Sequence, residues 1–276
     1  MTFGPHVLKW DKKEKTMLFG AIIGDITGSV YEFANIRSKN FPFMTDRCYI
    51  TDDSCMSIAV ASAIKQWREQ GGDLSQITAD TMRVVGKAYP NKGYGGMFLE
   101  WLNDTTIGPY NSWGNGAAMR VSAAGWFGEN IAEVKRLSYL VTSPTHDHIE
   151  GIKGAEAVAV AIFMARTGHS KDDIAEYIRN NYYPTCDCLA DLQEYYDWDS
   201  SCQGTVPPAL QCFFESTDFE DAIRNAISIG GDSDTIAAIT GSVAEAYYGI
   251  PPELIDQAKT YIPDDLLEII ELCETK

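Results

Sequence analysis

The stretch Ile-Gly-Gly-Asp-Ser-Asp-Thr-Ile-Ala-Ala, residues 229–238, decides how this chain folds. Apolar residues recur at helical spacing after it, until Gly249 and the Pro251-Pro252 pair. Asp232 and Asp234 are therefore expected at a helix N-terminus, where free N–H groups and the helix dipole favour negative charge. Helix capping explains one of these two acids but not the second. A cluster of oxygen ligands on a tight turn is, however, what a hard divalent cation binds. A doubly acidic helix cap and a metal site both fit this stretch alone.

A second acid pair repeats this design at Thr51-Asp52-Asp53, which also precedes an apolar helical pattern that Gly71-Gly72 ends. Adjacent carboxylates repel one another unless a cation lies near them. Two such pairs, brought face to face, predict a two-metal centre. Its proposed oxygen ligands are Thr51, Asp52, Asp53, Asp232, Asp234 and Thr235. An EF-hand loop starting at Asp232 does not fit, because Ala237 and Val243 stand where that loop needs Gly and Glu.

Residues 19–33 carry an apolar stripe at helical spacing that ends at Phe33. Gly20, Gly24 and Gly28 form a second stripe, four residues apart, which allows another helix or a ligand to approach the backbone closely. Asp25 interrupts the run and is expected to be a buried acid that supports the metal ligands. Glu32 stands where helix gives way to loop. We expect it to lie on a mobile lid near the metals, with a solvated helix-end carboxylate as the alternative.

The composition is that of a globular protein: 276 residues, 45% hydrophobic and 22% charged, with a net charge of −17. This negative charge disfavours nucleic acid and anionic membranes as partners. No apolar run is long enough to span a bilayer. The N-terminal 15 residues are polar and lack the apolar core of a signal peptide. The seven scattered cysteines are expected to be free thiols in a reducing cytoplasm. A zinc site built from Cys186, Cys188, Cys202 and Cys212 is the weaker alternative, because no Cys-x-x-Cys pair is present.

Two glycine-rich segments lie between the acid pairs. Residues 92–96, which contain Gly95, are expected to form a loop. Residues 114–120 run from Gly114, Asn115 and Gly116 into Met119 and Arg120, so their N–H groups are candidates for binding a phosphate. A plain helix-start turn fits them equally well. His146 and His148 have no evident third ligand, so hydrogen bonding or plain exposure is favoured over metal binding.

The remaining patterns are mostly helical and predict one compact all-α domain over residues 1–276. Amphipathic helices are expected over 172–181 and 218–229, and another is expected to begin at Pro251-Pro252. Residues 182–208, which end in Pro207-Pro208, are expected to be irregular. Alternating strand patterns are scarce, and no repeat stands out.

The ordered motifs resemble those of the ADP-ribosylglycohydrolases over roughly residues 17–250. They are Gly24-Asp25-Ile26-Thr27-Gly28-Ser29-Val30-Tyr31-Glu32, Thr51-Asp52-Asp53, Gly93-Tyr94-Gly95, Gly114-Asn115-Gly116-Ala117-Ala118-Met119-Arg120, Thr145-His146 and Gly230-Gly231-Asp232-Ser233-Asp234-Thr235. The resemblance implies an all-helical orthogonal bundle that holds two Mg²⁺ or Mn²⁺ ions through the six ligands named above. It also implies that Gly95, Gly114, Asn115, Gly116, Met119 and His146 contact ADP-ribose. The Tyr31-Glu32 ending is closer to the serine-type members than to the arginine-type ones.

The implied activity is hydrolysis of the bond between ADP-ribose and an acceptor such as a modified protein side chain. Glu32, Asp53 and Asp234 are the candidates to accept a proton from the attacking water, and the sequence does not choose among them. Other substrates that fit are O-acetyl-ADP-ribose, ADP-ribose polymers and other small ADP-ribose conjugates. An ADP-ribose-binding module without activity and a crystallin-like structural protein are the alternatives from other classes. A monomer is expected.

Overall fold

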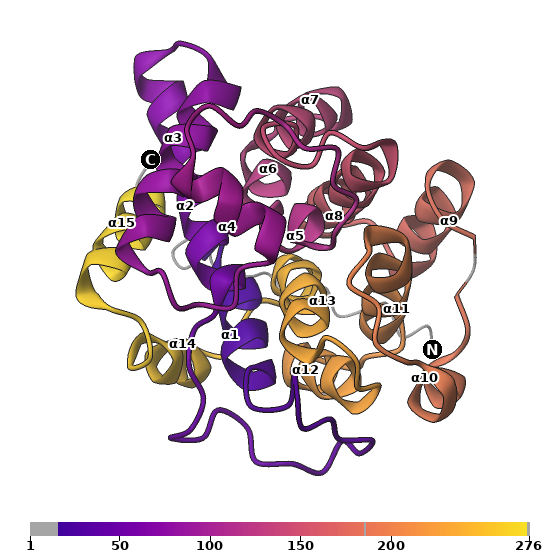
Figure 1. The fold of residues 1–276 in the computed structure, drawn as a ribbon. Helices are drawn as coiled ribbons and strands as arrows, with labels where there is room; N and C mark the ends of the chain where they lie inside the picture. Colours follow the sequence, from indigo (N-terminus) through magenta and orange to yellow (C-terminus); the bar gives the residue numbers. More distant parts are fainter. Residues whose placement is uncertain (1–15, 185, 275–276) are drawn as a thin grey trace.

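Helix α1 (Phe19–Gly28) lies along helix α13 (Ser233–Tyr248) at the centre of the molecule (Figure 1). Our computed structural model describes residues 16–184 and 186–274. A Cβ on Gly24 would lie 2.1 Å from the carbonyl oxygen of Ala237, and one on Gly28 would lie 2.4 Å from the Cα of Asp234. No side chain fits at such distances, so the glycine stripe sets how closely the two helices approach. This close packing places the end of α1 beside the start of α13.

The described residues contain fifteen helices and no strand, which confirms the all-α fold. Besides α1 and α13 they are α2 (Asp52–Gln70), α3 (Leu74–Ala88), α4 (Gly96–Asn103), α5 (Gly116–Met119), α6 (Ser122–Phe127), α7 (Ile131–Thr142), α8 (Ile149–Arg166), α9 (Lys171–Asn181), α10 (Leu189–Tyr195), α11 (Cys202–Phe214), α12 (Phe219–Ser228), α14 (Pro252–Lys259) and α15 (Asp264–Glu274). The expected helix ends are confirmed at Gly71 and Gly249, which both have φ of +74°. Glycine adopts this left-handed conformation at little cost.

The expected extent of the first helix was wrong, because α1 ends at Gly28 rather than near Phe33. The hydroxyl of Ser29 donates to the carbonyl of Ile26 at 2.8 Å and accepts the N–H of Tyr49 at 3.1 Å. These bonds turn the chain away from the helix axis and into the loop of residues 29–51. Phe33 is consequently 84% exposed instead of continuing the buried stripe.

The expectation of an irregular segment over residues 182–208 was also wrong. This region contains α10 and the first half of α11, and Pro207 and Pro208 lie inside α11. Proline removes a backbone donor, so the carbonyl four residues earlier loses its helical partner. The carbonyl of Gly204, which Pro208 leaves without an N–H donor, accepts the hydroxyl of Tyr196 at 3.3 Å instead. A side chain from outside the helix therefore replaces the donor that is lost at Pro208.

The described residues also bear on the cysteines and on membrane-spanning segments. All seven cysteines are free thiols. The group of possible metal-binding side chains found in the described residues consists of carboxylates and includes no cysteine, so the proposed zinc site has no support. Among the helices that the structure describes, none combines the length and apolar character needed to cross a bilayer.

Candidate active site

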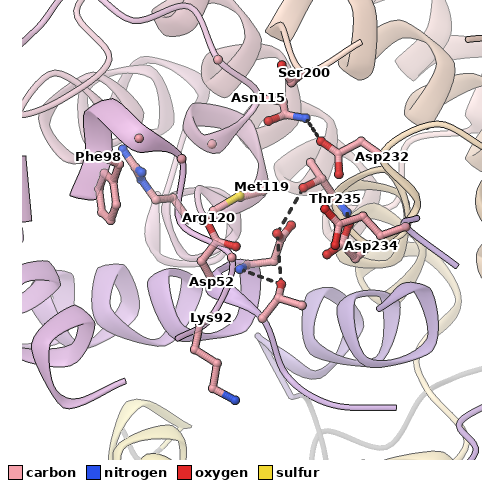
Figure 2. A pocket seen from close by; sticks show the side chains of 18 of the residues that line it. Asp52, Lys92, Phe98, Asn115, Met119, Arg120, Ser200, Asp232, Asp234 and Thr235 are labelled. Carbon is pink, nitrogen blue, oxygen red and sulfur yellow. Dashed lines mark hydrogen bonds between the residues drawn. The ribbon is translucent and has the colours of Figure 1, made fainter. Parts of the chain in front are cut away.

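A pocket of about 520 Å³ opens where the N-termini of α2, α5 and α13 converge. This volume lies within the range of small-molecule sites. The residues proposed for the two-metal centre, the residues implied to contact ADP-ribose and the proton-accepting candidate Glu32 all line this pocket. Figure 2 shows Asp52, Asn115, Asp232, Asp234 and Thr235 around it, contributed by three separate parts of the chain. The structure thus brings the proposed residues together, whereas their individual roles remain predictions.

The start of α13 presents two acids because a pair of glycines turns the chain into the helix. Gly230 and Gly231 have φ of +71° and +73°, a conformation that other residues adopt only with strain. Asp232 occupies the N-cap position but makes no side-chain capping hydrogen bond. Its carboxylate instead accepts the amide of Asn115 at 2.7 Å. Helix capping therefore does not explain the acid at position 232, because the carboxylate of Asp232 faces the pocket.

The start of α2 is connected directly to the start of α13. Thr51 caps α2 by accepting the N–H of Asp53. Asp53 Oδ2 accepts the hydroxyl of Thr235 at 3.1 Å, so the two acid-bearing helix ends face each other as expected. The other oxygen of Asp53, Oδ1, is buried and has no hydrogen-bond partner. A buried carboxylate oxygen without a donor is costly, and a cation would remove that cost.

Asp25 lies beneath this arrangement and is completely buried. It accepts the N–H of Thr51 at 2.9 Å, the hydroxyl of Thr51 at 2.7 Å and the N–H of Ser54 at 3.0 Å, and the hydroxyl of Ser54 also donates to it. A carboxylate on α1 therefore fixes the first turn of α2. Its supporting position agrees with the expectation from the sequence.

Glu32 reaches into the same group of acids from the loop after α1. Carboxylate oxygens of Glu32, Asp232 and Asp234 all lie within 4.8 Å of one another. Asp52 and Asp53 are outside this tight group. Asp53 is connected to it through Thr235, and Asp52 lies on the pocket wall with its N–H bonded to the carbonyl of Lys92. The acids thus form a close group of three with two further carboxylates beside it.

Burial raises the pKa of every acid in this cluster, and repulsion between carboxylates adds to the effect of burial at every one of them except Asp232. Burial raises the pKa values of Asp53 and Asp234 well above their usual range, and neighbouring carboxylates raise them further. The pKa of Asp52 rises to about 8 and that of Glu32 to about 7, mainly through burial and then through nearby aspartates. Asp232 is raised by burial, which outweighs the hydrogen bond from Asn115. All-oxygen donors that resist ionisation together fit a hard divalent cation, which would favour their charged forms.

The loop that carries Glu32 is held at two positions. Asn35 donates to the carbonyl of Gly231 at 2.9 Å and accepts its N–H at 2.8 Å. The guanidinium of Arg37 donates to the carbonyls of Tyr196 and Ile229, the C-terminal caps of α10 and α12. A cation at two helix C-termini is a favourable placement. Any lid is therefore limited to the few residues between Ser29 and Asn35.

The turn at residues 114–119 differs from the expected phosphate-binding arrangement. The N–H groups of Asn115, Ala117 and Ala118 donate to the carbonyls of Ser200, Gly114 and Asn115. The N–H of Gly114 donates to the hydroxyl of Ser112. These donors are used within the protein, because the turn is built as the start of the short helix α5. Several of the N–H groups proposed to bind a phosphate are therefore occupied.

Several lining residues were not recognised from the sequence. Tyr49, Lys92, Trp198 and Ser200 all contribute to the pocket. Lys92 and Tyr49 lie next to recognised motifs, so their proximity was a usable signal. Trp198 and Ser200 come from the segment expected to be irregular, and no local pattern marks them. The ring of Trp198 stacks on Phe33, with centroids 5.7 Å apart and planes 17° from parallel.

Fold and site together define a helical protein with a carboxylate-lined ligand pocket between opposed helix N-termini. A family model described as ADP-ribosylglycohydrolase matches residues 9–275. The chain belongs to the ADP-ribosylglycohydrolase family.

Similar proteins agree with this assignment. The chain is 25% identical to a Homo sapiens protein named ADP-ribosylhydrolase ARH3, over 91% of this chain and 90% of that protein. It is 24% identical to a Pseudomonas putida (strain GB-1) protein named ADP-ribosylarginine hydrolase Tri1, over 89% and 74%. A solved structure described as an ADP-ribosylglycohydrolase-related protein complex superimposes with a TM-score of 0.71 at 24% identity, covering 93% of this chain and 94% of the other. This structural likeness supports the fold.

Proposed function

We propose that this protein hydrolyses the glycosidic bond between ADP-ribose and an acceptor group, using two divalent ions, Mg²⁺ or Mn²⁺. The observation that carries the proposal is the meeting of two acid-bearing helix N-termini with Glu32 in one pocket, in a member of the ADP-ribosylglycohydrolase family. Modified protein side chains and small ADP-ribose conjugates are the proposed substrates. We also propose that the protein acts as a monomer. The free cysteines are consistent with a cytoplasmic location.

The proposed ligands of the ions are Thr51, Asp52, Asp53, Asp232, Asp234 and Thr235. When bound, such ions hold substrate hydroxyls and lower the pKa of a coordinated water. The unpaired Oδ1 of Asp53 and the raised pKa values of the aspartates support this ligand set. Asp25 would keep Thr51 in place through its two hydrogen bonds to that residue.

Glu32 is our proposed general base. Asp53 and Asp234 are 1% and 4% exposed, whereas Glu32 is half-buried and is carried by a loop. The oxygen of a water molecule would attack the anomeric carbon as the bond to the acceptor breaks, with Glu32 taking the proton of that water. Glu32 then gives this proton up to the departing acceptor, so that one water is consumed and the products are ADP-ribose and the unmodified acceptor. The aspartates would balance positive charge in the site.

The test offers arginine-linked, serine-linked and nucleic-acid-linked ADP-ribose, O-acetyl-ADP-ribose and an ADP-ribose polymer side by side, with release of ADP-ribose as the readout. We expect one protein linkage to be cleaved well above the others in the presence of Mg²⁺ or Mn²⁺. One relative is named an ADP-ribosylarginine hydrolase, and the Tyr31-Glu32 ending resembles the serine-type members of the family, so arginine and serine are the linkages to compare first. Binding of ADP-ribose without cleavage of any substrate would identify a binding module instead.

A further inference from the structure

Arg120, which follows α5, is a buried cation in the wall of the pocket. Its side chain is 2% exposed, and the ring of Phe98 lies 5.5 Å from its Cζ (Figure 2). Its Nη2 donates to the hydroxyl oxygen of Thr145 at 2.5 Å and lies 3.1 Å from His146 Nδ1. Among the described residues it takes part in no ion pair. A guanidinium buried without a carboxylate partner is costly, which points to a role beyond packing.

The contact between Arg120 and His146 determines where the imidazole proton lies. A guanidinium has only donors, so His146 Nδ1 must accept and cannot carry hydrogen. The hydroxyl of Thr145, 2.8 Å from Nδ1, accepts from Arg120 and can donate either to the ring or to the carbonyl of Thr142 at 3.5 Å, so it adapts to the tautomer of the ring and does not fix it. A neutral ring with a bare Nδ1 carries its proton on Nε2. Burial and the adjacent Arg120 also lower the pKa of His146 well below its usual value, which keeps the ring neutral.

The protonated Nε2 faces the glycine turn of the pocket. A Cβ on Gly116 would lie 3.3 Å from this nitrogen, and one on Gly114 would lie 3.5 Å from it. The absence of side chains at these two positions leaves the ring edge accessible to a ligand. Gly114, Gly116 and His146 all line the pocket. His148 is different, because its Nδ1 accepts the N–H of Glu150 at the start of α8.

We propose that Arg120 is a positioning residue that holds His146 neutral with its proton on Nε2, so that this N–H donates to an anionic oxygen of the ligand. The identity of the ligand rests on the proposed function, under which this anionic oxygen belongs to the diphosphate of ADP-ribose. The position of the proton does not depend on that function. The buried positive charge of Arg120 adds to the attraction for a diphosphate in a pocket that five carboxylates line. With several turn N–H groups already occupied, His146 supplies a donor that the turn does not.

The first test is the protonation state of His146 in the full-length protein. Two-bond hydrogen–nitrogen correlation spectra of the ¹⁵N-labelled chain distinguish the two neutral tautomers and the charged ring, and a His146→Gln spectrum identifies the signal. We expect the Nε2–H form at neutral pH. Thr145→Val should keep this form, because the contact with Arg120 remains. Arg120→Met should lose it, giving mixed tautomers or a charged ring, and Arg120→Lys should retain part of it.

The second test is binding of ADP-ribose and of adenosine by calorimetry, in the presence of Mg²⁺. Arg120→Met should weaken ADP-ribose binding by roughly tenfold or more, the size expected for a hydrogen bond to a charged group, while adenosine binding stays unchanged. The inference is overturned if the wild-type ring carries a proton on Nδ1, or if Arg120→Met keeps both the Nε2–H form and its ADP-ribose affinity. If Arg120→Met does not fold, the wild-type, Thr145→Val and Arg120→Lys spectra decide. An Nε2–H ring that responds to Arg120 in a protein that binds no ADP-ribose would support the inference and contradict the proposed function.

Discussion

Asp234 lies in the first turn of α13, between Glu32 on one side and the start of α2 on the other. Its carboxylate belongs to the tight group of three acids, and burial together with Asp53 raises its pKa well above the usual range. Asp234→Asn preserves shape and removes the charge that a divalent ion would need. We expect turnover to fall by at least roughly 100-fold, as the loss of several kcal/mol of metal-assisted stabilisation implies.

Calorimetric titration of Asp234→Asn with Mn²⁺ should show weakened metal binding. His146→Gln is the matched control, because it lies at the glycine turn and should weaken ADP-ribose binding while leaving Mn²⁺ binding intact. Asn115 is unsuitable for this purpose, since its amide holds the carboxylate of Asp232. Normal binding of two ions by Asp234→Asn would remove it from the ligand set.

Glu245 near the end of α13 predicts a pH dependence of stability that is separate from the active site. It is buried, accepts the N–H of Gly20 at 2.8 Å and the hydroxyl of Thr16 at 2.6 Å, and burial raises its pKa to about 7. The folded state therefore binds this proton more tightly than the unfolded state. The resulting stabilisation is complete below the unfolded pKa near 4.5 and is lost as pH rises through about 7.

Glu245→Gln should remove this loss, because a neutral amide can still accept from Gly20 and donate to Thr16. We expect the variant to unfold at higher denaturant concentration than wild type at pH 8.5, by an amount on the order of 3 kcal/mol. The difference should shrink at pH 5. If the difference in free energy of unfolding between wild type and Glu245→Gln does not change with pH, Glu245 keeps its ordinary pKa.

At the scale of elements, the contact between α1 and α13 positions the active site. Gly24 meets the carbonyl of Ala237 so closely that an added methyl group must push the helices apart. Gly24→Ala should lower the free energy of unfolding by about 1–3 kcal/mol or more, the typical cost of overpacking. Gly108→Ala is the control, because a Cβ there meets nothing within 4 Å. Thermal melting of both variants tests this close packing. Equal melting temperatures of Gly24→Ala and Gly108→Ala would contradict it.

The contact between Phe33 and Trp198 ties the Glu32 loop to the segment before α11. Both rings are exposed, at 84% and 45%, so they contribute little to the core and their stacking acts mainly on the loop. Trp198→Ala should reduce turnover by roughly 2–10-fold, in line with the energy of an aromatic pair, and should speed hydrogen exchange in residues 30–34. The melting temperature should stay near that of wild type. Unchanged turnover and exchange would show that the loop does not need this contact.

The helices at the site were predictable because their signals are local. Paired acids after Gly230-Gly231 and after Thr51, each followed by an apolar helical pattern, indicate two helix starts, and the glycine stripe in α1 indicates a close contact. Trp198 and Pro208 were not predictable in the same way. The place of Trp198 depends on Phe33, and the helical place of Pro208 depends on Tyr196 bonding to Gly204. Such compensation between distant residues leaves no local pattern.

For the whole molecule, a net charge of −17 with five acids lining one pocket means that cation binding and stability should be coupled. An ion that binds only the folded protein stabilises it by mass action, by about 2.7 kcal/mol at a concentration 100 times its dissociation constant. Melting temperature should therefore rise with added Mg²⁺ or Mn²⁺. Asp234→Asn should show a smaller rise. Equal melting temperatures with EDTA and with saturating Mn²⁺ would contradict a metal site at these acids.

The most direct test of a metal-dependent active site is ADP-ribose release by protein stripped with EDTA, followed by stepwise return of Mg²⁺ or Mn²⁺. The substrate carries the linkage from which ADP-ribose is released fastest in the comparison of acceptors. We predict no measurable release without metal, full recovery when either ion is restored, and little recovery in Asp234→Asn. Full activity in the metal-free protein would contradict the assignment of these carboxylates as metal ligands.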